Sequence, residues 1–169
     1  ESNYGCYLKP QWDWVVKELL NDRDTRRATF VVNQPHHKQR NKSDYPCTHY
    51  LHFFIRNNKL HLGVNMRSND IILGLCNDVF TFSLFQQLML NDLNFSLKNR
   101  LPNRRIQPLK LGKYHHTAGS FHIYEDHWPM MNKILGNYYV NHEKTAYPSL
   151  NKWKLSSTIN SENIFQHAL

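Results

Sequence analysis

The most regular alternation of apolar and polar residues lies between positions 50 and 66. Residues 50–55 (YLHFFI) and 59–66 (KLHLGVNM) each fit a β-strand, and the second segment alternates strictly. The polar triplet Arg56-Asn57-Asn58 between them is typical of a turn. This pattern predicts a β-hairpin.

The other segments mix helices and strands without a strict βαβ order. Helices are predicted at residues 12–20, 79–90 and 128–135, the last of them around Pro129. Extended segments are predicted at 28–32 and 114–124, and exposed loops at 34–43 and 94–109. This arrangement favours an α+β fold.

Composition limits the classes of protein. The chain has 169 residues, of which 40% are hydrophobic and 20% are charged, as in one globular domain with a sizeable core. No apolar run is long enough for a transmembrane helix, so no membrane partner is expected. Cys6, Cys47 and Cys76 are too few and too scattered for a disulfide framework, which favours a reduced, cytoplasmic compartment.

The charge is positive. Lys and Arg number 21 against 13 Asp and Glu, so the net charge of +8 predicts attraction to anions. Basic residues gather at 36–42 and 100–110, and a nucleic-acid binder is therefore one alternative. No helix-turn-helix, zinc-finger or RNP-type motif accompanies them, so a nucleic-acid partner is not expected. The 11 histidines match no zinc-binding spacing, and no metal is expected.

Cys47 is a candidate nucleophile. It lies directly after Pro46, just before a predicted strand. A cysteine attacks as the thiolate, which cationic neighbours favour. The alternative is that Cys47 is a small buried apolar residue.

Two arginine-containing segments are candidate phosphate ligands. Arg67 is followed by Ser68, and a guanidinium with a neighbouring hydroxyl suits a phosphate group. The alternative is a solvated turn in which Asp70 caps the following helix. Arg26-Arg27 is a second such pair, although on its own it is a charged strand end.

His122 and Tyr124 are two residues apart, so on a strand their side chains face the same side. Such a pair can form hydrogen bonds with a sugar hydroxyl.

Together these segments resemble the thymidylate synthase family, which includes the pyrimidine nucleotide hydroxymethylases. The likeness extends over about residues 4–150, and Cys47 precedes Arg67 by the family's twenty residues. It implies a mixed sheet packed with helices and a homodimer formed through one sheet face. The matching segments are Tyr4-Gly5, residues 24–27 (DTRR), Asn33-Gln34-Pro35, Pro46-Cys47, residues 67–75 (RSNDIILGL) and residues 116–127 (HTAGSFHIYEDH).

The resemblance implies a role for each candidate. Cys47 resembles the nucleophile that adds to C6 of a pyrimidine deoxynucleoside monophosphate, so that C5 attacks the one-carbon unit of 5,10-methylenetetrahydrofolate. Arg67 and Ser68 resemble phosphate ligands, and Asp70 resembles a folate contact. Arg26 and Arg27 resemble the arginines that reach the phosphate of the neighbouring subunit, whereas His122 and Tyr124 resemble the ligands of the sugar 3′-hydroxyl.

Asp78 distinguishes this chain within the family. Thymidylate synthases, which this sequence otherwise resembles, have asparagine at the corresponding position. The amide group of asparagine matches N3–H and O4 of uracil. A carboxyl group accepts from N4 of cytosine and shares a proton with N3. The adjacent Asn77 is the alternative reader, but one residue along a helix turns a side chain by about 100°. The resemblance therefore implies dCMP as substrate and 5-hydroxymethyl-dCMP as product, as in DNA modification of the phage type.

Other expectations concern organisation. We expect residues 1–169 to form one partial domain with a lengthened basic loop at 94–111 and a divergent tail at 151–169. The resemblance does not extend to the family's N-terminal third, which supplies a catalytic glutamate. It does not extend to the family's C-terminal lid either. Two alternatives stay open: a thymidylate synthase acting on dUMP, and a catalytically degenerate family member with a nucleotide-binding or structural role.

Overall fold

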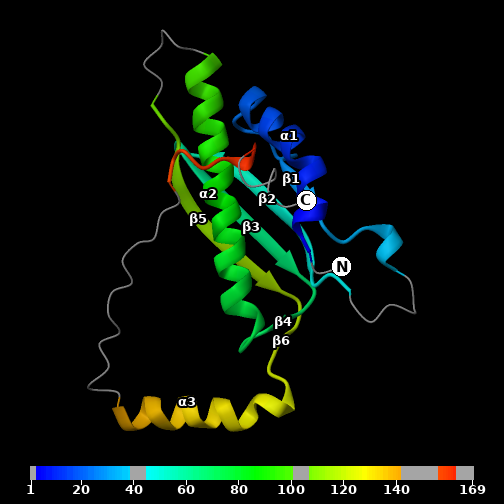
Figure 1. The fold of residues 1–169 in the computed structure, drawn as a ribbon, viewed down its shortest axis with the longest axis vertical. Helices are drawn as coiled ribbons and strands as arrows, with labels where there is room; N and C mark the ends of the chain where they lie inside the picture. The colour runs from blue at the N-terminus through cyan, green and yellow to red at the C-terminus, as the bar shows by residue number, and fades with distance from the viewer. Residues whose placement is uncertain (1–2, 39–44, 101–106, 142–155, 163–169) are drawn as a thin grey trace.

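A four-stranded sheet forms the centre of the computed structural model, which describes residues 3–38, 45–100, 107–141 and 156–162 (Figure 1). The strand order is β1-β2-β3-β5; β1, β2 and β3 are antiparallel neighbours, whereas β5 is parallel to β3. Two short strands, β4 and β6, pair in parallel beyond the end of β3. The strands are β1 (Thr29–Val31), β2 (Thr48–Arg56), β3 (Lys59–Met66), β4 (Asn69–Asp70), β5 (Lys110–Ala118) and β6 (Phe121–His122).

Two helices cover one face of the sheet, and the third lies beyond its end (Figure 1). α1 packs against β1, and α2 packs against β3 and β5. None of the described helices is long and apolar enough to cross a membrane. The helices are α1 (Gly5–Asn21), α2 (Gly74–Arg100) and α3 (Trp128–Asn141), with short 3-10 turns η1 (Pro35–His37) and η2 (Glu125–His127).

The core lies between the two helices and the covered sheet face. The ring of Phe30 on β1 has its centroid 5.3 Å from that of Trp12 on α1 and 5.7 Å from that of Phe53 on β2. Phe82 and Met89 of α2 are fully buried in the same cluster. Residues of the opposite sheet face alternate with these buried ones and are exposed or half-buried, as Tyr50 and Phe54 are. The described part of the chain therefore covers one face of the sheet.

The predicted α+β class and hairpin are confirmed. β2 and β3 pair along their length, and Asn57 and Asn58 between them have positive φ angles of 51° and 56°. This is the backbone of a two-residue type I′ turn, in which asparagine is favoured. Arg56 belongs to β2 and not to the turn. The predicted strand at 28–32 and helix at 128–135 are also present as β1 and α3.

Helix α1 begins earlier than predicted. The apolar pattern indicated residues 12–20, but the helix starts at Gly5 and contains Pro10. Proline is unfavourable inside a helix, because it lacks an N–H donor. Here burial of one continuous face outweighs that cost, and the buried residues recur at helical spacing: Leu8, Trp12, Val15 and Leu19.

The predicted basic loop at 94–111 is wrong at both ends. α2 extends from Gly74 to Arg100, well beyond the predicted 79–90, and β5 begins at Lys110. The polar residues near its end have distant partners: Asp92 accepts from the Trp12 indole at 2.6 Å, and both amide atoms of Asn94 bond to the backbone of Leu109. Residues 101–106 lie outside the described residues.

The predicted loop at 34–43 contains the turn η1, whose His37 is fully buried beside the Tyr7 hydroxyl at 3.0 Å. Residues 39–44 lie outside the described residues, as does the predicted tail at 151–169 except for 156–162. The single extended segment predicted at 114–124 is instead two strands, β5 from Lys110 to Ala118 and β6 from Phe121 to His122, which belong to different sheets. At Gly112, a Cβ atom would lie only 2.5 Å from the carbonyl oxygen of Leu60, so this register requires glycine.

The aromatic contact between α1 and the sheet gives a test of the core. We expect Phe30→Ala to lower the free energy of unfolding by about 3–5 kcal/mol, because it leaves a cavity between Trp12 and Phe53. The matched control is Phe95→Ala, the same substitution on α2 at a side chain that is 58% exposed, and it should change stability by less than about 1 kcal/mol. Urea unfolding followed by circular dichroism measures both, and equal effects would contradict this core.

Candidate active site

A pocket of about 300 Å³ lies where the chain leaves β3. It is bordered by the residue before α1, the segment entering β2, the end of β3, β4, the beginning of α2, and β6. Six of the predicted site residues line it: Cys47, Ser68, Asp70, Asp78, His122 and Tyr124.

Backbone hydrogen bonds between two distant segments build this pocket. Gly119 and Ser120 donate to the carbonyl oxygens of Met66 and Arg67 at 2.9 and 3.0 Å. Beyond them, the N–H groups of Asn69 and Ile71 donate to Ser120 and His122 at 2.8 and 2.9 Å. The segment after β3 therefore lies directly beside the segment after β5, and the candidate phosphate and sugar ligands share one cavity.

Cys47 and Arg67 form a close pair. The Arg67 N–H donates to the Cys47 carbonyl at 2.8 Å, and Nη2 of Arg67 lies 3.6 Å from the Cys47 sulfur. Arg67 Nε and Nη2 also donate to the carbonyls of Pro46 and Tyr45, each at 3.2 Å, and its guanidinium lies 5.3 Å from the centre of the Tyr45 ring. These contacts hold a positive charge beside the sulfur atom that must be anionic to attack.

Asp70 caps the beginning of α2, while phosphate binding by Arg67 and Ser68 stays a prediction. Its Oδ2 accepts from the N–H groups of Leu73 at 2.6 Å and Gly74 at 3.3 Å. Burial on its own would raise the pKa of Asp70, but backbone N–H groups of Leu73, Ile72 and Gly74 outweigh burial and lower it. Asp70 also lines the pocket, and its contact with folate stays a prediction.

Asp78, and not Asn77, faces the pocket. The Asn77 side chain is exposed and donates to the Leu73 carbonyl at 2.8 Å. Asp78 is half-buried, and its Oδ2 accepts from Nδ2 of Asn69 at 2.6 Å. Burial raises the pKa of Asp78, while the hydrogen bond from Asn69 and the charge of His116 partly oppose this rise.

Three further groups near Asp78 escaped prediction as site residues. The hydroxyl of Tyr114 is hydrogen-bonded to Nδ1 of His116 at 2.6 Å. Burial lowers the pKa of His116. Burial and the charge of Asp78 together raise the pKa of Tyr114. Tyr4 lines the pocket with Cys47, and burial raises the pKa of its hydroxyl. Tyr4 was singled out only as part of a motif. Tyr114 has no local sequence signal that separates it from an ordinary strand residue.

His122 and Tyr124 both line the pocket, although they do not share the strand that the prediction assumed, because β6 ends at His122. Their rings are perpendicular, with centroids 5.0 Å apart. Tyr124 follows β6 and is 58% exposed, so its hydroxyl is available to a ligand. The binding of a sugar hydroxyl by this pair stays a prediction.

Arg26 and Arg27 lie outside the pocket, just before β1. Both are exposed, and Nε of Arg27 forms an ion pair with Glu18 at 2.8 Å. They contribute nothing to the pocket of their own chain, and their role toward a neighbouring subunit stays a prediction. No group of three or more His, Cys, Asp or Glu side chains within the described ranges is arranged to hold a metal ion.

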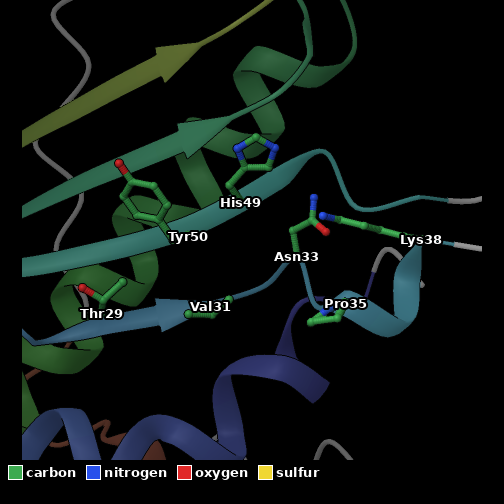
Figure 2. A pocket seen from close by; sticks show the side chains of 7 residues that line it. All are labelled: Thr29, Val31, Asn33, Pro35, Lys38, His49 and Tyr50. Atoms are coloured by element: carbon green, nitrogen blue, oxygen red, sulfur yellow. The ribbon is translucent and has the colours of Figure 1, made fainter.

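A second pocket, of about 380 Å³, lies at the β1–β2 edge and holds none of the predicted site residues (Figure 2). Val31 and Tyr50 of its lining lie on the uncovered sheet face, while Asn33, Pro35 and Lys38 come from the segment after β1. Its lining includes neither Cys47 nor Asp78, so it is a poorer candidate for the expected chemistry than the first pocket.

Comparison with known proteins decides the family. Residues 9–167 match the family model described as thymidylate synthase. The chain belongs to the thymidylate synthase family. Family membership confirms the resemblance drawn from the ordered motifs.

Individual relatives include phage deoxycytidylate hydroxymethyltransferases and bacterial thymidylate synthases. The chain is 30% identical over 140 residues to deoxycytidylate 5-hydroxymethyltransferase of Enterobacteria phage T6, covering 78% of this chain and 54% of that protein. It is 26% identical over 117 residues to thymidylate synthase of Bacillus subtilis subsp. natto, covering 69% and 37%. The chain thus spans about half the length, or less, of these relatives.

A solved structure confirms the fold. Thermostable thymidylate synthase A from Bacillus subtilis superposes with a TM-score of 0.60 at 24% identity, over 75% of this chain and 40% of that one. The α+β architecture of helices on a mixed sheet is therefore that of the thymidylate synthase fold.

The Cys47–Arg67 pair predicts selective thiol chemistry. We expect Arg67→Gln to slow alkylation of Cys47 by iodoacetamide about 3- to 10-fold, because it removes the positive charge beside the sulfur. Arg67→Lys should restore much of the rate. Peptide mass spectrometry measures each thiol separately, and the exposed Cys6 and Cys76 are internal controls whose rates should not change. An unchanged Cys47 rate would show that Arg67 does not act on the thiolate.

Proposed function

We propose that the protein containing this chain transfers a one-carbon unit from 5,10-methylenetetrahydrofolate to C5 of dCMP and releases 5-hydroxymethyl-dCMP. The observation that carries this proposal is that Cys47 and Asp78 line one pocket, with Arg67 beside the sulfur. Family membership and the phage hydroxymethyltransferase relatives support the same reaction class.

In the proposed reaction, the Cys47 thiolate forms a bond to C6 of the base, and the C5–C6 π electrons move onto C5. C5 then attacks the methylene carbon supplied by the folate and later loses its proton. Elimination of tetrahydrofolate would leave an exocyclic methylene group; water would add its oxygen to this carbon and lose a proton, and the π electrons would return to C5. The S–C6 bond breaks last, which restores the aromatic ring and the Cys47 thiolate.

Asp78 would read the base and assist the first step. A carboxyl group with a raised pKa can place a proton on N3 of cytosine, which draws electrons from C6 and eases attack there. Its other oxygen accepts from the N4 amino group. Uracil would instead bring its O4 acceptor toward the oxygens of the ionised carboxylate, which has no donor for it, and this unmatched contact disfavours dUMP.

The phosphate of the nucleotide would lie against Arg67 and Ser68. Two N–H donors of Arg67, on Nη1, make no hydrogen bond to other described residues. We infer that Arg26 and Arg27 of a second subunit complete this site and that the uncovered sheet face forms the homodimer interface. The exposure of both arginines away from their own pocket supports this arrangement.

A thymidylate synthase acting on dUMP is the second candidate, which the Bacillus relatives favour. The two candidates differ in the base that is accepted, and a direct assay separates them.

Release of tritium from C5 of labelled dCMP and labelled dUMP tests the proposed function in the full-length protein. We expect release from dCMP, none from Cys47→Ser, and a shift of preference toward dUMP on the order of 10³-fold in Asp78→Asn. Release by the wild-type protein from dUMP alone would overturn the role of Asp78. Calorimetry that detects binding of neither nucleotide would favour a degenerate family member.

The shared phosphate site predicts complementation between defective subunits. We expect little activity from Cys47→Ser alone or from the double variant Arg26→Ala/Arg27→Ala alone. Co-expression of the two should restore about one quarter of wild-type activity, because half of the dimers are mixed and each contains one intact site. Failure of complementation in dimers shown to be mixed would contradict the shared site.

A further inference from the structure

Asn69 is the side chain that most directly fixes the orientation of Asp78. It lies on β4 with only 3% exposure, and its amide donates to Oδ2 of Asp78 at 2.6 Å. Its own backbone N–H is bonded to the Ser120 carbonyl at 2.8 Å, which anchors it to the segment after β5. Among the described residues, no other side chain forms a hydrogen bond with Asp78 in this structure.

We propose that Asn69 is a positioning residue that makes this pocket select cytosine, by holding Oδ2 of Asp78 so that the carboxyl group is turned toward the base. This inference rests on the proposed function, because it specifies how the same pocket distinguishes two pyrimidines.

The donor count of the pair supports this role. A carboxylate accepts hydrogen bonds only, so the side of Asn69 that faces Asp78 must be the NH₂ group. The amide oxygen Oδ1 of Asn69 then points elsewhere, and it is buried without a hydrogen-bond partner among the described residues. The other oxygen of Asp78, Oδ1, makes no hydrogen bond to a described residue, so it stays available to the amino group of cytosine. Uracil has only an oxygen at that position.

The space around the pair is fitted to it. A Cβ atom on Gly74 would lie 3.2 Å from Nδ2 of Asn69 and 3.6 Å from Oδ2 of Asp78. Glycine as the first residue of α2 therefore leaves the amide–carboxyl contact unobstructed, whereas a side chain there would press on the Asn69 amide.

The groups around Asp78 determine how loss of Asn69 would change the pKa of Asp78. The titratable groups that face Asp78 are Tyr4 from the N-terminal segment and Tyr114 and His116 from β5. Burial raises the pKa of Asp78, and the Asn69 hydrogen bond opposes that rise. Without this donor the carboxyl group would stay protonated to higher pH, because burial would then be less opposed.

Asn69→Leu in the full-length protein tests the proposal, since leucine keeps the shape and removes donor and acceptor. Asn77→Leu is the matched control: the same substitution beside Asp78, at an exposed residue outside the pocket. The measurements are calorimetric affinities for dCMP and dUMP and the ¹³C NMR titration of the Asp78 carboxyl group. If Asn69→Leu does not fold, the smaller Asn69→Ala, which also removes donor and acceptor, replaces it.

We expect Asn69→Leu to weaken dCMP binding by about 10-fold or more, since a hydrogen bond to a charged group is lost. Affinity for dUMP should fall less, and the Asp78 titration should move to higher pH, while Asn77→Leu changes none of these. An unchanged dCMP-to-dUMP ratio and Asp78 titration would overturn the role of Asn69 and leave the proposed function standing. A wild-type protein that binds neither nucleotide would overturn both.

Discussion

The hydrogen bonds that join the backbone after β3 to the backbone after β5 are the constraint on which the pocket depends. Because β3 and β5 are parallel, the backbone leaves both strands at the same end of the sheet. The two segments that follow continue side by side as β4 and β6. This places residues 67–70 beside residues 119–122, although about fifty positions separate the two segments in the chain. Cys47 joins them because it enters β2, the other neighbour of β3.

The same junction gives two carboxyl groups opposite environments. Asp70 is held by backbone N–H groups at the beginning of α2, which lower its pKa, whereas burial raises that of Asp78. The sequence identified both as candidates, together with Cys47 and Arg67, because ordered motifs carry their positions. It could not identify Asn69 or Tyr114 as partners, because their contacts depend on how separate strands pair.

The limits of prediction for the fold have the same physical origin. The hairpin of β2 and β3 was predictable, because its alternation and its asparagine turn are local. The full length of α2 was not, because polar residues near its end look like a loop until their partners are known. Asn91 donates to the carbonyls of Ser156 and Ile159, and Asp92 accepts from Trp12. Such distant contacts leave no periodic pattern in the sequence.

A crystal structure of the full-length protein with dCMP tests the central claim most directly, namely that this pocket reads cytosine through Asp78. We predict that one oxygen of Asp78 lies within hydrogen-bond distance of N3 or N4 of the base, that C6 faces the Cys47 sulfur, and that the phosphate contacts Arg67. A nucleotide bound with its base away from Asp78, or bound in another pocket, would contradict the account.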